Sequence, residues 1–209
     1  MKLIALLLLL SPAAHADSIR MRPFEAGNRS VGLQIGVATP SQPAFKKGAR
    51  NGPFIGIPVT YYLSDWIAVG AELSFLNFSG TALPGTQGAS TFELSQKFRA
   101  ISATIFGRVN FFERGTWTPY VLGGAGVHTT SASNTIETLS GPEVLSPVEP
   151  IQPGSGIAVT AGTGVEVFLV RDASLSFDVR FHKLYLKSPN DLESLSFMLG
   201  FHYWWGRNW

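Results

Sequence analysis

Strict alternation at the end of the chain constrains the fold more than any other sequence feature. The odd-numbered positions from Leu195 to Trp205 are all leucine or aromatic, whereas the even-numbered positions between them hold Ser, Met, Gly, His and Trp. Successive side chains of a β-strand point to opposite faces. The pattern therefore predicts a strand with one uniformly apolar face, and residues 157–169 and 174–182 repeat it.

Eight such strands can be traced along the chain. Weaker alternation marks the other five, residues 29–38, 53–63, 66–78, 92–112 and 117–130. Short connections at 64–65, 113–116 and 171–173 alternate with long ones at 39–52, 79–91 and 131–155. An even number of strands, with short turns at one end and long loops at the other, is typical of outer-membrane barrels. We therefore predict an all-β fold, an eight-stranded antiparallel up-and-down transmembrane β-barrel.

A soluble sandwich or lipocalin-like barrel would also alternate, so the face that carries charge must decide. A soluble barrel turns charge outward, whereas here Glu166 is in phase with Gly162 and Gly164. The interior of an eight-stranded barrel only just admits side chains, which suits glycine. Aromatic residues near the predicted strand ends favour a membrane interface, and they are Trp66, Trp117, Tyr203, Trp204 and Trp205. This combination favours the membrane barrel.

The first 16 residues have the pattern of a signal peptide. Lys2 precedes an apolar run that ends at Leu10, and Ala14-His15-Ala16 provides small residues for cleavage. The run is far shorter than the roughly 20 residues of a spanning helix. We expect residues 1–16 to be removed and residues 17–209 to form the barrel domain. The chain has no Cys, and its 16 Lys and Arg are scattered against 14 Asp and Glu, which excludes a disulfide scaffold and argues against nucleic acid as a partner.

Two segments resemble a known family. Thr118-Pro119-Tyr120-Val121-Leu122-Gly123-Gly124-Ala125-Gly126-Val127 is similar to the fifth strand of small outer-membrane β-barrel proteins of the outer-membrane-protein-A-like, porin-like type, and Gly200-Phe201-His202-Tyr203-Trp204-Trp205 to their closing strand. The resemblance implies a location in the cell outer membrane and contact with its lipid and lipopolysaccharide. It also implies that the barrel-assembly machinery reads the closing strand.

The inward face is predicted to carry both signs of charge. Its polar members are Gln34, Glu72, Arg108, Glu166, Asp178, Arg180, His182 and His202. An unpaired buried charge costs several kcal/mol, so we expect both arginines to pair with the carboxylates. A last hairpin centred near residue 190 would place His202 opposite Asp178 and Met198 opposite His182. We interpret the set as a polar network that closes the lumen; the alternative is a narrow pore for ions or small solutes, because ionisable groups inside a membrane are functional candidates.

An enzymatic alternative rests on a second resemblance. Arg180-Phe181-His182 with Lys187-Ser188-Pro189-Asn190-Asp191 is similar to the end of outer-membrane lipid A deacylases, which implies a nucleophilic serine two residues after the histidine. Leu184 occupies that position, and Ser188 is the only close serine. The histidines after residue 16 lack the spacing of a zinc motif. We therefore expect no enzyme activity, no cofactor and no metal.

Two predicted loops are candidates for surface contacts. Residues 131–155 are rich in Pro, Ser and Gly, with three Glu and no Lys or Arg, which indicates an extended, exposed loop that offers a contact site for a surface partner. Residues 39–52 include Lys46, Lys47 and Arg50. These three are candidates for binding lipopolysaccharide phosphates as point charges.

Overall fold

A computed structural model describes residues 25–41, 50–80, 83–87, 90–112, 116–140, 154–186 and 191–206. Within these ranges lie nine β-strands: β1 (Arg29–Pro40), β2 (Gly52–Tyr62), β3 (Ile67–Phe78), β4 (Leu83–Gln87), β5 (Ser90–Asn110), β6 (Trp117–Ser140), β7 (Ser155–Val170), β8 (Ala173–Leu184) and β9 (Leu192–Trp205). None of the described residues form a helix long and apolar enough to cross a membrane.

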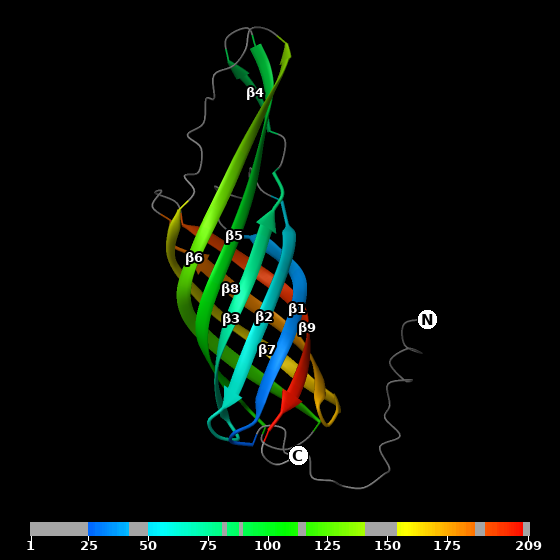
Figure 1. Ribbon diagram of the computed structural model, residues 1–209. Coiled ribbons are helices and arrows are strands. Elements are labelled where there is room, and N and C mark those ends of the chain that lie inside the picture. Colours follow the sequence, from blue (N-terminus) through cyan, green and yellow to red (C-terminus); the bar gives the residue numbers. More distant parts are fainter. Residues whose placement is uncertain are drawn as a thin grey trace, which may run out of the picture.

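Eight of these strands close into an antiparallel barrel, and β4 stands outside it (Figure 1). Each strand of the barrel pairs with its neighbours in the sequence, and β1 pairs with β9 along its whole length. β3 pairs directly with β5, so β4 is bypassed. The predicted fold class is confirmed.

The apolar faces of the strands point out of the barrel. Burial alternates residue by residue along β2, and the outward side chains of Ile105, Leu199 and Phe201 have exposed fractions of 72%, 62% and 51%. Charged residues such as Glu166 and Asp178 are fully buried inside. The soluble alternative is therefore wrong, because a barrel in water would expose the charges and bury the large apolar residues.

The short turns from β2 to β3 and from β7 to β8 lie at one end of the barrel, where β5 and β9 also end and β1 begins (Figure 1). Short turns are periplasmic and long loops extracellular in outer-membrane barrels. Four of the five aromatics predicted at a membrane interface lie at this periplasmic end with their rings exposed: Trp66, Trp117, Tyr203 and Trp205. The fifth, Trp204, is 1% exposed, so its prediction as an interface residue is wrong. Its even position turns it inward, between two outward rings.

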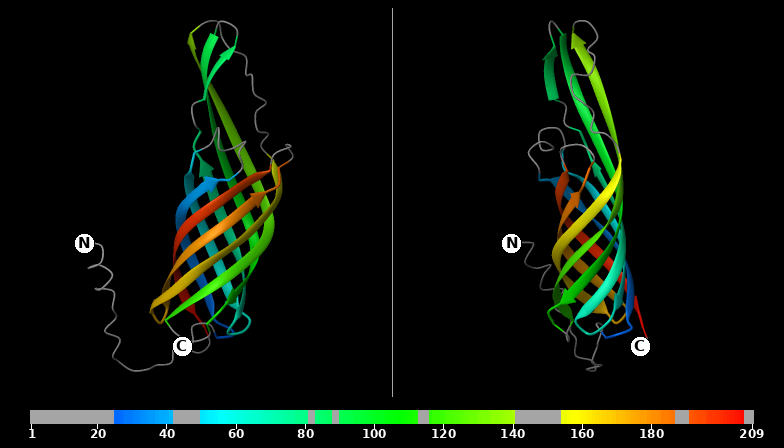
Figure 2. Two further views of the ribbon diagram at one scale, coloured as in Figure 1. Left: turned by 180° about the vertical axis from the view of Figure 1, so that it is seen from behind. Right: turned by 90° about the vertical axis from the view of Figure 1, so that its left-hand side faces the viewer.

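At the opposite end, β5 and β6 continue far beyond the barrel (Figure 2). Residues 131–140 belong to β6 and pair with the first residues of β5, to which β4 adds a third strand. The prediction that 131–155 is a loop is therefore wrong for 131–140, and 141–153 lie outside the described residues. The predicted loop 79–91 is likewise wrong where it contains β4. These segments are rich in Ser, Thr and Asn and lack an apolar face, so hydrophobic periodicity did not reveal them.

Candidate functional site

The barrel interior contains all eight polar residues that the sequence placed on the inward face. Each is at most 5% exposed: Gln34, Glu72, Arg108, Glu166, Asp178, Arg180, His182 and His202. They come from β1, β3, β5, β7, β8 and β9, so barrel closure brings together residues far apart in the sequence. Their contacts form two clusters.

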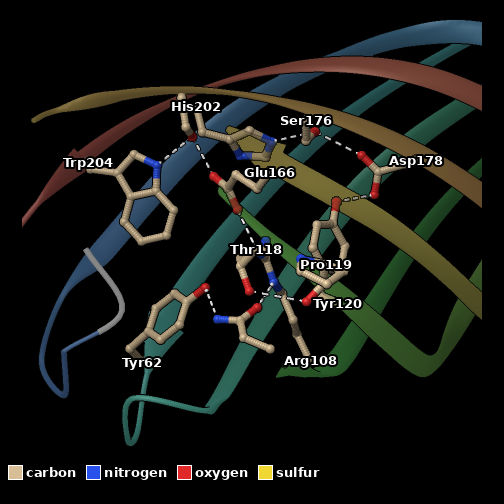
Figure 3. Close-up of polar contacts among 12 residues, drawn as sticks. Tyr62, Arg108, Thr118, Pro119, Tyr120, Glu166, Ser176, Asp178, His202 and Trp204 are labelled. Atoms are coloured by element: carbon tan, nitrogen blue, oxygen red, sulfur yellow. Dashed lines mark hydrogen bonds and ion pairs between the residues drawn. The ribbon is translucent and has the colours of Figure 1, made fainter. Parts of the chain in front are cut away.

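Arg108 is the centre of the first cluster (Figure 3). Its Nη2 donates to Glu166 Oε2 at 2.5 Å, and its Nε donates to Asn110 Oδ1 at 2.8 Å. The guanidinium carbon lies 3.6 Å from the ring centroid of Tyr120. The charge is thus paired with a carboxylate and stacked on an aromatic face, a combination for which the planar guanidinium is suited and an ammonium is not.

Arg180 joins two carboxylates in the second cluster. Its Nη1 donates to Glu72 Oε2, and its Nη2 donates to Asp178 Oδ1 at 3.1 Å. Asp178 also accepts hydrogen bonds from Gln34 Nε2, at 3.1 Å, and from the Tyr120 hydroxyl. Tyr120 therefore links the two clusters, since its ring faces the first and its hydroxyl binds the second (Figure 3).

The predicted pairing of the last hairpin is wrong by four residues. Asp178 lies opposite Met198, and His202 lies opposite Ser174; His182 lies opposite Ser194. A shift by an even number of residues leaves every side chain on its predicted face, so alternation alone could not reveal it.

His202 and Asp178 nevertheless belong to one chain of contacts. The hydroxyl of Ser176 lies 3.0 Å from His202 Nε2 and 2.8 Å from Asp178 Oδ2. A serine therefore bridges the two groups that the sequence had placed in direct contact (Figure 3).

Two apolar layers, which the sequence analysis missed, enclose the polar network. The extracellular layer contains Ala38, Phe54, Leu76, Phe78, Phe98, Ala100, Ala158, Leu184, Leu192 and Met198. The periplasmic layer contains Tyr62, Ala68, Phe168 and Trp204. These residues occupy the same alternating, even-numbered positions as the polar inward residues. The alternation in the sequence could therefore have identified them as inward-facing. The interior is therefore a charged layer between two apolar ones, which opposes the passage of hydrated ions.

His182, the histidine of the deacylase alternative, points into the barrel. It is 5% exposed and its ring centroid lies 5.3 Å from that of Phe54. Its Nε2 has no hydrogen-bond partner among the described residues. Ser188 lies outside the described residues. The face of β8 that meets lipid presents Phe181 instead, so the imidazole is turned away from the acyl chains of the outer leaflet.

Of the three candidate lipopolysaccharide contacts, the structure describes Arg50 alone. Arg50 is exposed beside the extracellular end of β3. Its backbone N–H donates to the backbone carbonyl oxygen of Ser79 at 2.8 Å. Lys46 and Lys47 lie outside the described residues. Two further cations that the sequence analysis did not select, Lys97 and Arg99, are exposed on β5 at the same end.

Solved structures share this fold at low sequence identity. Neisserial surface protein A is 14% identical with a TM-score of 0.54, covering 85% of this chain and 98% of that chain. The outer membrane protein OprG from Pseudomonas aeruginosa is also 14% identical with a TM-score of 0.54, covering 90% and 100%. Ail from Yersinia pestis, solved with the heparin analogue sucrose octasulfate, is 14% identical with a TM-score of 0.50, covering 86% and 99%.

The sequence itself identifies the family. No curated protein matches the chain. Residues 3–203 match the outer membrane protein beta-barrel domain, which spans nearly all of the chain. Together with outward apolar faces and an interior of paired charges, this match establishes that the chain belongs to the outer membrane protein beta-barrel family.

Proposed function

We propose that this protein is a closed, non-enzymatic barrel that presents a β-sheet at the cell surface for binding other molecules. The observation that carries the proposal is the extension of β4, β5 and β6 beyond the barrel on the side of the long loops (Figure 2). A rigid barrel with a projecting sheet holds a contact surface clear of the membrane. The interior supports a closed lumen, because paired charges and two apolar layers fill it.

The outer edge of β6 is the best candidate for the contact. Pairing with β7 stops at Thr129, opposite Ser155, and among the described residues no strand pairs with the second side of 131–140. An open edge of this length offers backbone N–H and C=O groups to an extended peptide. Residues 131–140 contain no Pro or Lys, the residues that commonly protect an edge.

The opposite edge of the projecting sheet differs. β4 has five residues and contains Pro84, which lacks a donor N–H. A short strand with proline is a poor template for further pairing. The sheet therefore favours strand addition at β6. The contact site for a surface partner, which the sequence analysis expected in a loop, is thus proposed for the strand residues 131–140.

The projecting sheet should retain extended peptides. The mature protein, in nanodiscs, is screened against an array of ten-residue peptides. The control replaces residues 81–95 and 135–152 by short Gly-Ser linkers, which keeps the pairing of β3 with β5 from Phe98 onward. Peptides held by the native protein and lost by the shortened one are expected. If both proteins retained the same peptides equally, the proposal would be wrong.

Proline substitution then tests the edge itself. Successive N–H groups of a strand point to opposite sides, so Asn134→Pro and Thr135→Pro remove donors on different sides of β6. One variant should abolish peptide binding by blocking the open edge. Binding that survives in both variants would exclude strand addition.

We infer that the cations at the extracellular rim bind lipopolysaccharide phosphates. Phe75 and Ile101 form the last outward apolar pair of β3 and β5, and the next outward pair is Asn77 with Arg99. Lys97 follows on β5. The cations thus begin where the apolar band ends, at the depth of the phosphates of the outer leaflet.

A charge variant tests this contact. Lys97→Gln with Arg99→Gln should weaken binding of purified lipopolysaccharide by roughly 10–30-fold at low salt, given about 1 kcal/mol per cation. Lys183→Gln is the matched control, because Lys183 already pairs with Glu193 at 3.0 Å and Asp191 at 3.5 Å. A similar loss in the control would contradict a specific site.

Export and assembly complete the proposal. We infer that residues 1–16 direct export and are removed, so that the mature protein begins at Asp17. The closing strand, β9, is then read by the barrel-assembly machinery. The apolar outward face of β9 supports this order, since it would aggregate in water before insertion.

A further inference from the structure

We propose that the periplasmic end of the barrel binds the phosphate of an inner-leaflet glycerophospholipid at Arg29. A groove of about 620 Å³ lies there, lined by Ala26, Gly27, Arg29, Tyr61, Trp205 and Gly206. Its volume is within the usual range for a small-molecule site. This groove is separate from the projecting sheet and from the rim cations at the other end.

Strand register assembles the groove. Arg29 lies opposite Tyr61 of β2 on one side and opposite Trp205 of β9 on the other. The guanidinium carbon lies 5.6 Å from the ring centroid of Tyr61, and the Trp205 ring stacks on Tyr203 with centroids 6.1 Å apart. The cation therefore lies over the Tyr61 ring, and Trp205 on the neighbouring strand adds a second aromatic side chain to the groove, of the kind that suits the headgroup region.

The depth of Arg29 fits a lipid phosphate. Arg29 is the first outward residue of β1, and the next three are Val31, Leu33 and Ile35, all exposed. β9 lies beside β1 (Figure 1), and its exposed Phe201, opposite Leu33, continues the apolar surface. A phospholipid whose phosphate lies at Arg29 would place its acyl chain along these residues. The binding surface thus matches both parts of the molecule.

Charge favours this groove over a second one on the other side of Trp205. The second groove is lined by Arg171, Asp172, Tyr203, Trp204, Trp205 and Gly206, so a carboxylate stands beside its arginine. No carboxylate lines the first groove among the described residues. An anionic phosphate is therefore assigned to Arg29, and Arg171 provides a matched control.

The test uses the mature protein in uncharged detergent micelles with a small, fixed fraction of phosphatidylethanolamine. Native mass spectrometry counts the lipids that remain bound. Arg29→Gln should lower the affinity of the retained lipid about fivefold, as expected for one interfacial cation. Arg171→Gln should leave it within twofold. Arg29 is exposed, so the variant should fold, and unboiled gel mobility checks that it has.

Two further binding measurements distinguish a phospholipid from other ligands. Diacylglycerol with the same acyl chains should bind at least fivefold more weakly than the phospholipid, and millimolar inorganic phosphate should displace neither. Equal retention of diacylglycerol would show an apolar contact without a phosphate site. Displacement by inorganic phosphate would show an anion site that does not select lipid. Either result, or equal losses for Arg29→Gln and Arg171→Gln, overturns the proposal.

Discussion

Arg180→Ala should lower the free energy of unfolding of the barrel by about 3–5 kcal/mol. Arg180 pairs with Glu72 and Asp178, and all three side chains are at most 3% exposed. Its removal leaves two carboxylates in the lumen without their cation. The loss is measured by urea unfolding of the protein in lipid bilayers, followed by gel mobility. Arg99→Ala is the control, because an exposed arginine should change stability by about 0.5 kcal/mol or less.

Neutralising the whole cluster tests whether unpaired charge causes this loss. Arg180→Met combined with Glu72→Gln and Asp178→Asn removes the ion pairs and leaves no buried charge in the cluster. Replacing a buried pair by neutral groups of similar volume is often neutral or stabilising. The triple variant should therefore recover most of the stability that Arg180→Ala loses. A triple variant as unstable as the single one would contradict unpaired charge as the cause of the loss.

Trp204→Ala should lower the free energy of unfolding by about 3–5 kcal/mol, as large-to-small changes of buried aromatics do. The Trp204 ring fills the periplasmic layer between Tyr62 and Phe168, with centroids 5.4 and 5.2 Å away. Its Nε1 donates to Ser174 Oγ at 2.8 Å. Urea unfolding in bilayers again gives the measurement. Trp205→Ala is the matched control: this neighbouring ring is 39% exposed and faces outward, so its removal should cost less.

The same variant tests how the lumen is closed. Trp204→Ala removes the largest side chain of the periplasmic layer, but the pair of Arg108 with Glu166 and the extracellular layer remain. Planar-bilayer recordings of the native protein and of Trp204→Ala should therefore both lack steady openings. Discrete openings that change on Arg108→Ala would instead support the pore alternative.

Much of the fold could be predicted from residue order alone. Alternation in residues 157–169, 174–182 and 195–205 identified strands and the face that each turns to lipid, because it is a local property of an extended chain. The inward position of Arg108 and Arg180 follows from the same parity. Their need for carboxylate partners follows from the cost of burying charge.

Tertiary structure decided the strand register, which the alternation of odd and even positions does not encode. The last hairpin pairs Asp178 with Met198 and not with His202, because pairing along β1 and β8 fixes the register of β9 while an even shift keeps all faces unchanged. The tertiary structure also determines that Arg180 binds Glu72, a residue 108 positions away in the chain.

The projecting sheet is the clearest case of structure that the sequence pattern did not predict. Residues 131–140 are mostly small and polar, and they form a strand because β5 extends alongside them and satisfies the backbone groups on one of their two sides. Sequence by itself determined the barrel, its faces and its charged interior, since those depend on apolar periodicity. Tertiary structure alone decided the register, the ion-pair partners and the edge of β6 along which no described strand pairs, since those depend on which parts of the chain meet when the sheet closes.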